Sequence, residues 1–320
     1  MATTDAAVST TATDGDDLRV LQVATSDRSF FTQQVEALEA QGVECTTVTV
    51  PRPDEGGRGP REYAQFYAQT VREAVDGHDL VHANYGLVGP LALAPPVRPV
   101  VLTLWGSELL GDRGWLDRWS RFAATHSDAV VVPTEHLAAE LDAPHDLVPF
   151  GVDTDLFRPI DRETARERVG WDDDRRHVLF PYDPARDVKD YPRAERVVGQ
   201  LGDDVMLETV SGVPYEEMPY YMNASDALLV TSSHESGPMV VKEAAACNVP
   251  VVSTDVGFVD EVLDGVTDSH VAGTDTALVD ALDGILRAGG RSDGRATVDT
   301  LGVDRMAEEL VGVYRRALDR

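Results

Sequence analysis

Two carboxylates, Glu235 and Glu243, are separated by seven residues in HESGPMVVKEA, a segment that follows the apolar run DALLVT after two serines. Gly237 and Pro238 predict a turn between them, and a helix is expected to begin near Met239. Open α/β sheets bind ligands beyond the carboxyl ends of their strands, so both carboxylates are expected at a binding edge. At such an edge a carboxylate can accept hydrogen bonds from the hydroxyl groups of a sugar or a ribose.

The predicted helix start supplies a second kind of chemistry. The backbone N–H groups of Met239 and Val240 have no acceptor within the helix, and free N–H groups at a helix start bind phosphate. We therefore expect a diphosphate beside this helix start, with Glu235 at a sugar and Glu243 at a ribose. Two simpler alternatives stay open: Glu235 as an ordinary loop carboxylate, and Glu243 as a charge that favours the first helical turn.

The two carboxylates and the helix start are positioned by the strands and helices of the rest of the chain. Along the chain, short apolar runs alternate with stretches of helical periodicity. That alternation predicts parallel sheets wrapped by helices. It runs from the strand LRVLQVAT to residue 148, and it resumes at HVLFPY after the Gly- and Pro-containing segment PFGVDTDLFRP. The sequence predicts an α/β fold of two Rossmann-like domains facing across a cleft. The expected parts are a disordered acidic tail, two domains and an amphipathic C-terminal helix, over residues 1–17, 18–150, 151–300 and 301–320.

Several segments resemble one known family. ASDALLVTSSHESGPMVVKEAAACNVPVVSTDVGFVDEVL resembles the donor-site core of retaining glycosyltransferase family four, including its E-x7-E signature. VPFGVDTDLFRP resembles the segment that joins the two domains in that family, and DLVHANYGLVG and LTLWGSELLG resemble its acceptor-domain segments more loosely. The resemblance implies the GT-B fold, with the C-terminal helix packing back on the N-terminal domain. It also implies transfer of a sugar from a nucleotide-diphosphate donor to an acceptor hydroxyl, with retention of anomeric configuration.

The resemblance gives a role to one of the two lysines. Among 28 Lys and Arg residues, only Lys189 and Lys242 are lysine. Family members place an Arg and a Lys after the first strand of the second domain, where both reach the donor diphosphate, and Arg186 and Lys189 stand in the corresponding place. The alternative for this cationic pair is ion pairing with nearby aspartates (Asp183, Asp187, Asp190). Lys242 lies about 100° around the helix from Glu243 and is expected on a solvated or salt-bridged face.

The resemblance also implies which residues take part in catalysis, which bind the donor and which lie on the acceptor side of the cleft. The expected catalytic residues are Glu235, Arg186 and Lys189. The expected donor-binding residues are Glu243, Gly237, Met239, Val240 and Val213. The expected acceptor-side residues are Ser26, Gly106, Ser107 and Glu108. The side chains of Ser107 and Glu108 have an alternative role as caps of the helix that follows them. The acceptor side departs most from the family, because SDRSFF replaces a glycine pair and Trp105 stands where histidine is common.

No cofactor or metal is expected. Asp153 and Asp155 form an Asp-x-Asp pattern, but it lies in the joining segment, and the eight histidines show no paired ligand spacing. The chain also lacks a P-loop, a nucleophile elbow and a Gly-x-Gly-x-x-Gly after its first strand. Two other functions stay open: a GT-B nucleotide-sugar epimerase and a non-catalytic nucleotide-sugar-binding scaffold. Conversion of free nucleotide sugar without acceptor would distinguish the epimerase.

The amino-acid composition limits which binding partners and which cell compartment are expected. Asp and Glu number 56 against 28 Lys and Arg, a formal net charge of −28, which opposes binding to nucleic acid. Abundant acid with almost no lysine is typical of halophilic proteins, whose self-repulsion is screened by salt. Prolines interrupt the longest apolar run, residues 87–104, so no transmembrane segment is expected. We expect a cytoplasmic enzyme whose partners are a nucleotide sugar and a glycan or lipid-linked acceptor, with peripheral membrane contact left open.

Overall fold

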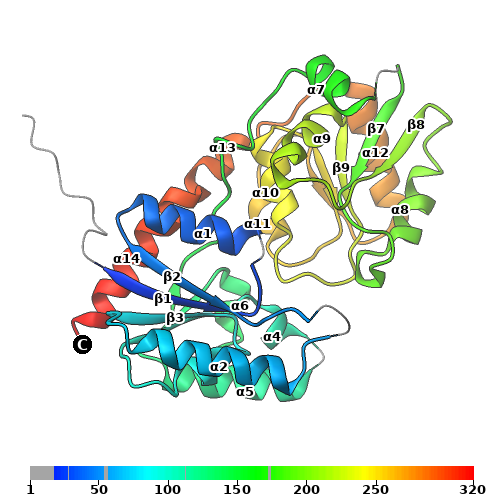
Figure 1. The fold of residues 1–320 in the computed structure, drawn as a ribbon. Coiled ribbons are helices and arrows are strands. Elements are labelled where there is room, and N and C mark those ends of the chain that lie inside the picture. The colour runs from blue at the N-terminus through cyan, green and yellow to red at the C-terminus, as the bar shows by residue number, and fades with distance from the viewer. Residues whose placement is uncertain (1–17, 28, 54–56, 112, 172–173) are drawn as a thin grey trace, which may run out of the picture.

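The computed structural model describes residues 18–27, 29–53, 57–111, 113–171 and 174–320. The chain forms two parallel β-sheets, each with helices on both faces (Figure 1). The predicted fold class, α/β with two Rossmann-like units, is confirmed. The expected tail over 1–17 lies outside the described residues.

The first sheet has the strand order β2-β1-β3-β4-β5-β6, and every pair of neighbours is parallel. Its central strands are buried on both faces, which explains their continuous apolar sequences. The elements of this half are β1 (Arg19–Ala24), α1 (Ser29–Ala40), β2 (Glu44–Thr49), α2 (Pro60–Ala74), β3 (Leu80–Asn84), α3 (Gly89–Ala92), β4 (Val100–Thr103), α4 (Ser107–Leu110), α5 (Gly114–His126), β5 (Ala129–Val132), α6 (Glu135–Ala139) and β6 (Asp146–Leu147).

The second sheet has the order β11-β10-β9-β7-β8, again all parallel. One apolar core joins its strands to the helices of this half. The elements are α7 (Arg162–Val169), β7 (Arg176–Phe180), the 3-10 turn η1 (Asp187–Lys189), α8 (Tyr191–Val198), β8 (Val205–Thr209), η2 (Tyr215–Glu217), α9 (Met218–Ala224), β9 (Ala227–Val230), α10 (Met239–Ala246), β10 (Val251–Ser253), α11 (Val259–Leu263), β11 (His270–Val271), α12 (Asp275–Ala288), α13 (Arg295–Val298), η3 (Asp299–Leu301) and α14 (Val303–Leu318).

Both sheets reverse their strand order at one internal place. In the first sheet β1 lies between β2 and β3, and in the second β7 lies between β8 and β9. The loops after the two strands at such a reversal diverge to opposite faces and leave room for a ligand between them. The fold therefore predicts ligand contacts from the loops after β1 and β3 in one half, and after β7 and β9 in the other.

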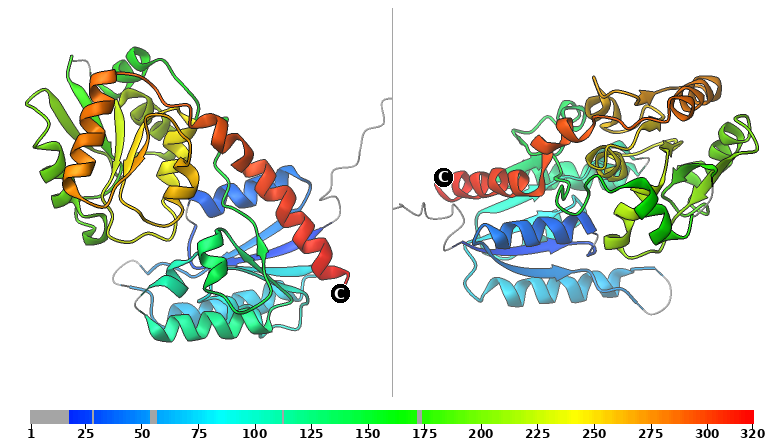
Figure 2. Two further views of the ribbon diagram at one scale, coloured as in Figure 1. Left: turned by 180° about the vertical axis from the view of Figure 1, so that it is seen from behind. Right: turned by 90° about the horizontal axis from the view of Figure 1, so that it is seen from above.

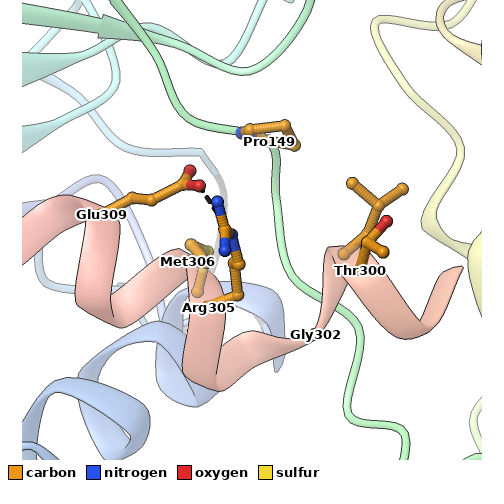
Figure 3. A pocket seen from close by; sticks show the side chains of 7 residues that line it. Pro149, Thr300, Gly302, Arg305, Met306 and Glu309 are labelled. Carbon is orange, nitrogen blue, oxygen red and sulfur yellow. Dashed lines mark hydrogen bonds and ion pairs between the residues drawn. The ribbon is translucent and has the colours of Figure 1, made fainter.

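The chain crosses between the halves twice, and the two crossings are bonded to each other. The Val152 N–H donates to the Leu301 carbonyl at 2.9 Å, and the Val303 N–H donates to the Val152 carbonyl at 3.2 Å. Gly151 is required here, because a Cβ at this position would lie 2.5 Å from the Val303 Cα. A hollow of about 350 Å³ lies beside the crossing, with Arg305 paired to Glu309 at its wall (Figure 3).

Helix α14 returns to the first half and packs beside α1, as the resemblance implies (Figures 1 and 2). Its Tyr314 is fully buried, and the hydroxyl lies 2.7 Å from His82 Nδ1 and accepts from Gln22 Nε2 at 3.2 Å. His82 Nε2 lies 2.7 Å from the Thr103 hydroxyl. Burial lowers the pKa of His82 to about 3, so the ring is neutral and each nitrogen has a defined partner.

Helix α7 and the short helices α11 and α13 were not predicted from the sequence. In α7 only Ala165 is buried, so the helix has no apolar stripe that periodicity could reveal. It is defined by its ends, where the Asp161 side chain accepts from the Thr164 N–H and Gly170 adopts a left-handed conformation. Helix α3, which follows Gly86, is a single turn.

Replacing Tyr314 with Phe should destabilise the protein by about 1–3 kcal/mol, because His82 and Gln22 would keep buried polar atoms without this partner. Chemical denaturation in concentrated KCl measures the change in unfolding free energy. Tyr67→Phe is the matched control, since Tyr67 is 38% exposed and its loss of a hydroxyl should change stability little. Equal effects of the two substitutions would show that the buried network does not hold α14.

Candidate active site

The reversal of strand order in the second sheet brings Lys189 and Glu235 together. Lys189 ends the turn η1 after β7, Glu235 lies in the loop after β9, and these two strands are hydrogen-bonded neighbours. The Lys189 ammonium forms an ion pair with the Glu235 carboxylate, to which the Ser232 hydroxyl also donates at 2.8 Å. Lys189 is 4% exposed, and its ammonium lies 3.7 Å from the centre of the Tyr182 ring. The two expected catalytic groups are thus in contact.

The backbone around this pair is fixed by the neighbouring strand end. The Thr231 hydroxyl donates to the carbonyls of Lys189 and Asp190, each at 3.0 Å. The Ser233 N–H donates to the Val188 carbonyl at 2.9 Å. The loop after β9 therefore holds the loop after β7, so the lysine and the glutamate cannot move independently.

Arg186 is exposed, and its side chain forms no ion pair with any residue that the structure describes. The alternative pairing with nearby aspartates does not occur there. Asp183 instead accepts from the Ala185 N–H at 2.9 Å, and Asp190 accepts from the Arg193 N–H at 3.2 Å at the start of α8. The guanidinium group is consequently available to an anionic ligand.

Helix α10 begins at Met239, as expected, and its start has no side-chain cap in the described part of the chain. Pro238 stands immediately before it, and the N–H groups of Met239 and Val240 belong to the first turn, where helical acceptors are absent. Gly237 is required because a Cβ there would lie 2.2 Å from the Phe258 ring. This uncapped start is suited to an anion.

Glu243 is buried on α10, and its Oε1 accepts a hydrogen bond from the Tyr215 hydroxyl at 2.7 Å. Burial raises the pKa of Glu243 to about 7, partly offset by that hydrogen bond. Tyr182 was not singled out from the sequence. Burial, and then the charges of Glu235 and Glu243, raise the pKa of Tyr182 well above 10; its hydroxyl lies close to the Ser232 side chain but has no hydrogen bond of normal geometry to a described residue. A buried hydroxyl without a partner beside two carboxylates is a candidate ligand contact.

The acceptor-side residues of the loop after β4 have different environments. Gly106 has a φ of 105°, and a Cβ there would lie 2.8 Å from the Ser236 Cβ of the second half. Ser107 is exposed, with its hydroxyl 3.2 Å from the Tyr85 hydroxyl. Glu108 is fully buried. The prediction that it faces the acceptor needs correction in part.

Glu108 binds backbone inside the first half. Its Oε1 accepts from the N–H groups of Trp105 and Gly86, at 2.8 and 3.0 Å. Burial raises the pKa of Glu108 to about 6, and the backbone hydrogen bonds lower it. The side chain ties the loop after β4 to the loop after β3, and among the described residues no side chain caps the start of α4, so the capping alternative is not seen either. Its effect on an acceptor would be through the position of these loops.

An aromatic cluster at the junction of the halves was not predicted. Its members Phe30, Tyr85, Trp105 and Phe150 come from three loops and the first turn of α1, with ring centres 4.6–5.4 Å apart. Met239, the first residue of α10, packs against this cluster. Tyr85 has a φ of 96°, a strained conformation for a side chain of its size, and strain of this kind is concentrated at functional sites. The only signal in the sequence was that aromatic residues follow three strands.

Two further assigned residues have other surroundings. Ser26 lines a hollow of about 500 Å³ with Arg52 and Arg58, beyond the ends of β1 and β2. Val213 is partly buried and packs against the core of the second half.

The predicted exposure of Lys242 is wrong. The sequence placed it on a solvated or salt-bridged face, but it is 2% exposed. Its ammonium donates to the Phe150 carbonyl at 2.7 Å and lies 4.6 Å from the centre of the Phe258 ring. The helical spacing was read correctly, but the other half of the molecule covers this face.

The described residues contain no cluster of three or more His, Cys, Asp or Glu that could hold a metal ion. Asp153 accepts from the N–H groups of Asp155 and Leu156, at 3.0 and 2.8 Å, and so caps a turn of the joining segment. In the same part of the chain no helix is long and apolar enough to cross a membrane. Cys45 and Cys247 are free thiols.

Family models match both halves of the chain. The model for Glycosyltransferase Family 4 matches residues 10–156, and the model for Glycosyl transferases group 1 matches residues 192–293. A D-inositol 3-phosphate glycosyltransferase of Mycobacterium marinum is 29% identical over 236 residues, which are 60% of this chain and 51% of that protein. The chain therefore spans about half the length of this relative.

Solved structures resemble the whole molecule. Sucrose-phosphate synthase from Thermosynechococcus elongatus has a TM-score of 0.73 at 21% identity, covering 93% of this chain and 98% of that one. Anabaena Alr3699/HepE in complex with UDP has a TM-score of 0.73 at 14% identity, covering 93% of this chain and 100% of that one. At these identities the likeness establishes the fold, which is GT-B.

The raised pKa of Glu243 should appear in the pH dependence of stability. With a pKa of about 7 when folded and 4.5 as its ordinary value, Glu243 stabilises the fold below about pH 4.5 and loses that contribution as the pH rises to about 7. Relative to Glu243→Gln, the native protein should lose up to roughly 3 kcal/mol of unfolding free energy over this interval. Denaturation at a series of pH values measures the difference. A difference independent of pH would contradict the raised pKa.

Proposed function

This chain belongs to glycosyltransferase family 4, and on that premise we propose that it transfers a sugar from a nucleotide-diphosphate donor to an acceptor hydroxyl, with retention of anomeric configuration. One observation carries the site of transfer. Lys189 and Glu235 pair at the strand reversal of the second half, Glu235 is four residues before the uncapped start of α10, and the charges of Glu235 and Glu243 both act on Tyr182, whose ring faces Lys189. Cationic, anionic and backbone donor groups thus converge where a nucleotide sugar would need them.

We assign the diphosphate to Lys189, Arg186 and the start of α10. As the bond between sugar and phosphate breaks, negative charge grows on the leaving nucleotide diphosphate. An ammonium already buried beside a fixed loop can stabilise that charge without reorganisation. Arg186, which is exposed and without an ion pair among the described residues, can fold onto the outer phosphate oxygens.

Glu235 has a different role in the free and the donor-bound protein. Without donor it neutralises Lys189. A bound diphosphate competes for that lysine, and the Glu235 carboxylate is then free to accept hydrogen bonds from the hydroxyl groups of the sugar. Glu243 accepts from the ribose in the same way that it accepts from Tyr215 in the present structure. No protein nucleophile is assigned.

The acceptor enters from the first half, over the aromatic cluster and the loop after β4. Contact between Gly106 and Ser236 brings the two halves together at this point, and such closure excludes water that would hydrolyse the donor. We propose a glycan or lipid-linked acceptor and a salt-rich cytoplasm as the working environment. The UDP bound by the Anabaena neighbour supports testing uridine donors first.

Substitution of the two cationic groups should separate their roles. Lys189→Met should lower kcat by roughly 10²–10³, because the fixed charge acts on the leaving group. Arg186→Ala should mainly raise the KM for donor, because an exposed guanidinium contributes to binding in the ground state as well. The assay follows nucleotide release from UDP-, GDP- and ADP-sugars in concentrated KCl with mixed lipid and glycan acceptors.

Arg287→Ala is the matched control for Arg186→Ala, since Arg287 is exposed and lies in an ion pair on α12 far along the chain from the site. It should change neither parameter. Proton NMR of the product reports the anomeric configuration. Inversion, turnover that needs no acceptor, or full activity in Lys189→Met would each contradict the proposed function.

A further inference from the structure

The second lysine of the chain is a contact between the two halves of the molecule. Lys242 lies on α10 of the second half, and the Phe150 carbonyl to which it donates lies at the end of the first half. Phe150 itself is buried and packs against Phe30, at 5.4 Å between ring centres, in the aromatic cluster. A single ammonium therefore links the donor helix to the residues that face the acceptor.

Burying this ammonium has a cost that an apolar side chain would avoid. Desolvation lowers the pKa of Lys242 to about 8, with a small opposing effect from Glu261. Methionine or leucine would fill similar space without loss of hydration. An apolar residue, however, cannot donate a hydrogen bond to the Phe150 carbonyl, which belongs to a buried residue at the crossing between the halves.

The position of Lys242 within α10 makes this contact relevant to the site. The next residue is Glu243, and Met239, less than one turn before, carries a free N–H group and packs on the aromatic cluster. Helix α10 is short and buried, so a displacement at Lys242 is transmitted to both. The alignment of the reacting groups tolerates little displacement, since an error of about 1 Å can cost roughly 10²-fold in rate.

We propose that Lys242 is a positioning residue for glycosyl transfer: its bond to Phe150 fixes the start of α10 against the aromatic cluster, so that donor and acceptor are held at one separation. The inference rests on the proposed function for its kinetic consequence, and on the observed contact alone for its structural one. It assigns no contact between Lys242 and the donor.

The space around Lys242 suggests how a conservative variant will behave. A cavity of about 190 Å³ adjoins the ammonium, and it is lined from both halves, by Thr134 and Glu135 on one side and Phe258 and Glu261 on the other. The charged or titratable groups facing this region are Glu135 and His136 from α6 and Asp260 and Glu261 from α11. An arginine has room to enter the cavity and still donate to the Phe150 carbonyl.

The first test uses kinetics of three variants of the full chain. Lys242→Met should lower kcat by roughly ten- to hundredfold while changing the KM for donor less than about threefold. Lys242→Arg should recover most of that loss. Val241→Ala is the matched control, because Val241 is also buried on α10 but belongs to the core of the second half. It should lower the melting temperature while leaving kcat within about twofold.

The second test needs no activity. Hydrogen exchange at the amides of Gly151 and Val152 should be at least about tenfold faster in Lys242→Met than in the native protein, and unchanged in Val241→Ala, because only the first variant frees the crossing. If the native chain transfers no sugar, the proposed function fails while this result stands. Unchanged exchange in Lys242→Met, or equal kinetic loss in Val241→Ala at a matched melting temperature, would overturn the positioning role.

Discussion

A buried charge must have a partner, and in this protein that requirement joins the two loops of the proposed donor site. Lys189 is almost completely enclosed, its ammonium faces the Tyr182 ring, and Glu235 is the carboxylate that neutralises it. The pair lies 46 residues apart in the chain and meets only because β7 and β9 are neighbours at the strand reversal. A ligand with its own negative charge can replace Glu235 as partner, so the same pair can stabilise the empty site and bind the filled one.

The two halves are related through short contacts at the edge of that site. Helix α10 supplies two of them: Met239 packs on the aromatic cluster, and Lys242 donates to the Phe150 carbonyl. The crossings at Val152 and Val303 are bonded to each other, so motion of one half is constrained close to this helix. Helix α10, which we propose binds the donor, is therefore also the part of the second half that contacts the first.

Much of this arrangement could be predicted from the sequence, because its signals are local. The alternation of apolar runs gave both parallel sheets, and the turn before Met239 gave the start of α10. Contacts between the halves could not be predicted, because burial there depends on packing of segments far apart in the chain. Lys242 shows the difference: its direction on α10 follows from helical geometry, but whether water or Phe150 lies in that direction does not. The role of Glu108 was misassigned and the aromatic cluster was missed because both depend on packing between segments far apart in the chain. Helix α7 was missed because charged residues lie on almost every face of it.

The exchange of partners at Lys189 is tested most directly by calorimetric titration of Glu235→Gln. The probes are a nucleoside diphosphate and the corresponding nucleotide sugar, titrated into the native protein and the variant in concentrated KCl. Removing the carboxylate removes an anion that competes for the ammonium, so we expect tighter binding of the nucleoside diphosphate. The nucleotide sugar should gain less or bind more weakly, because its hydroxyl groups lose their acceptor. Weaker binding of both ligands by the same factor would contradict this exchange and would leave Glu235 with only a structural role.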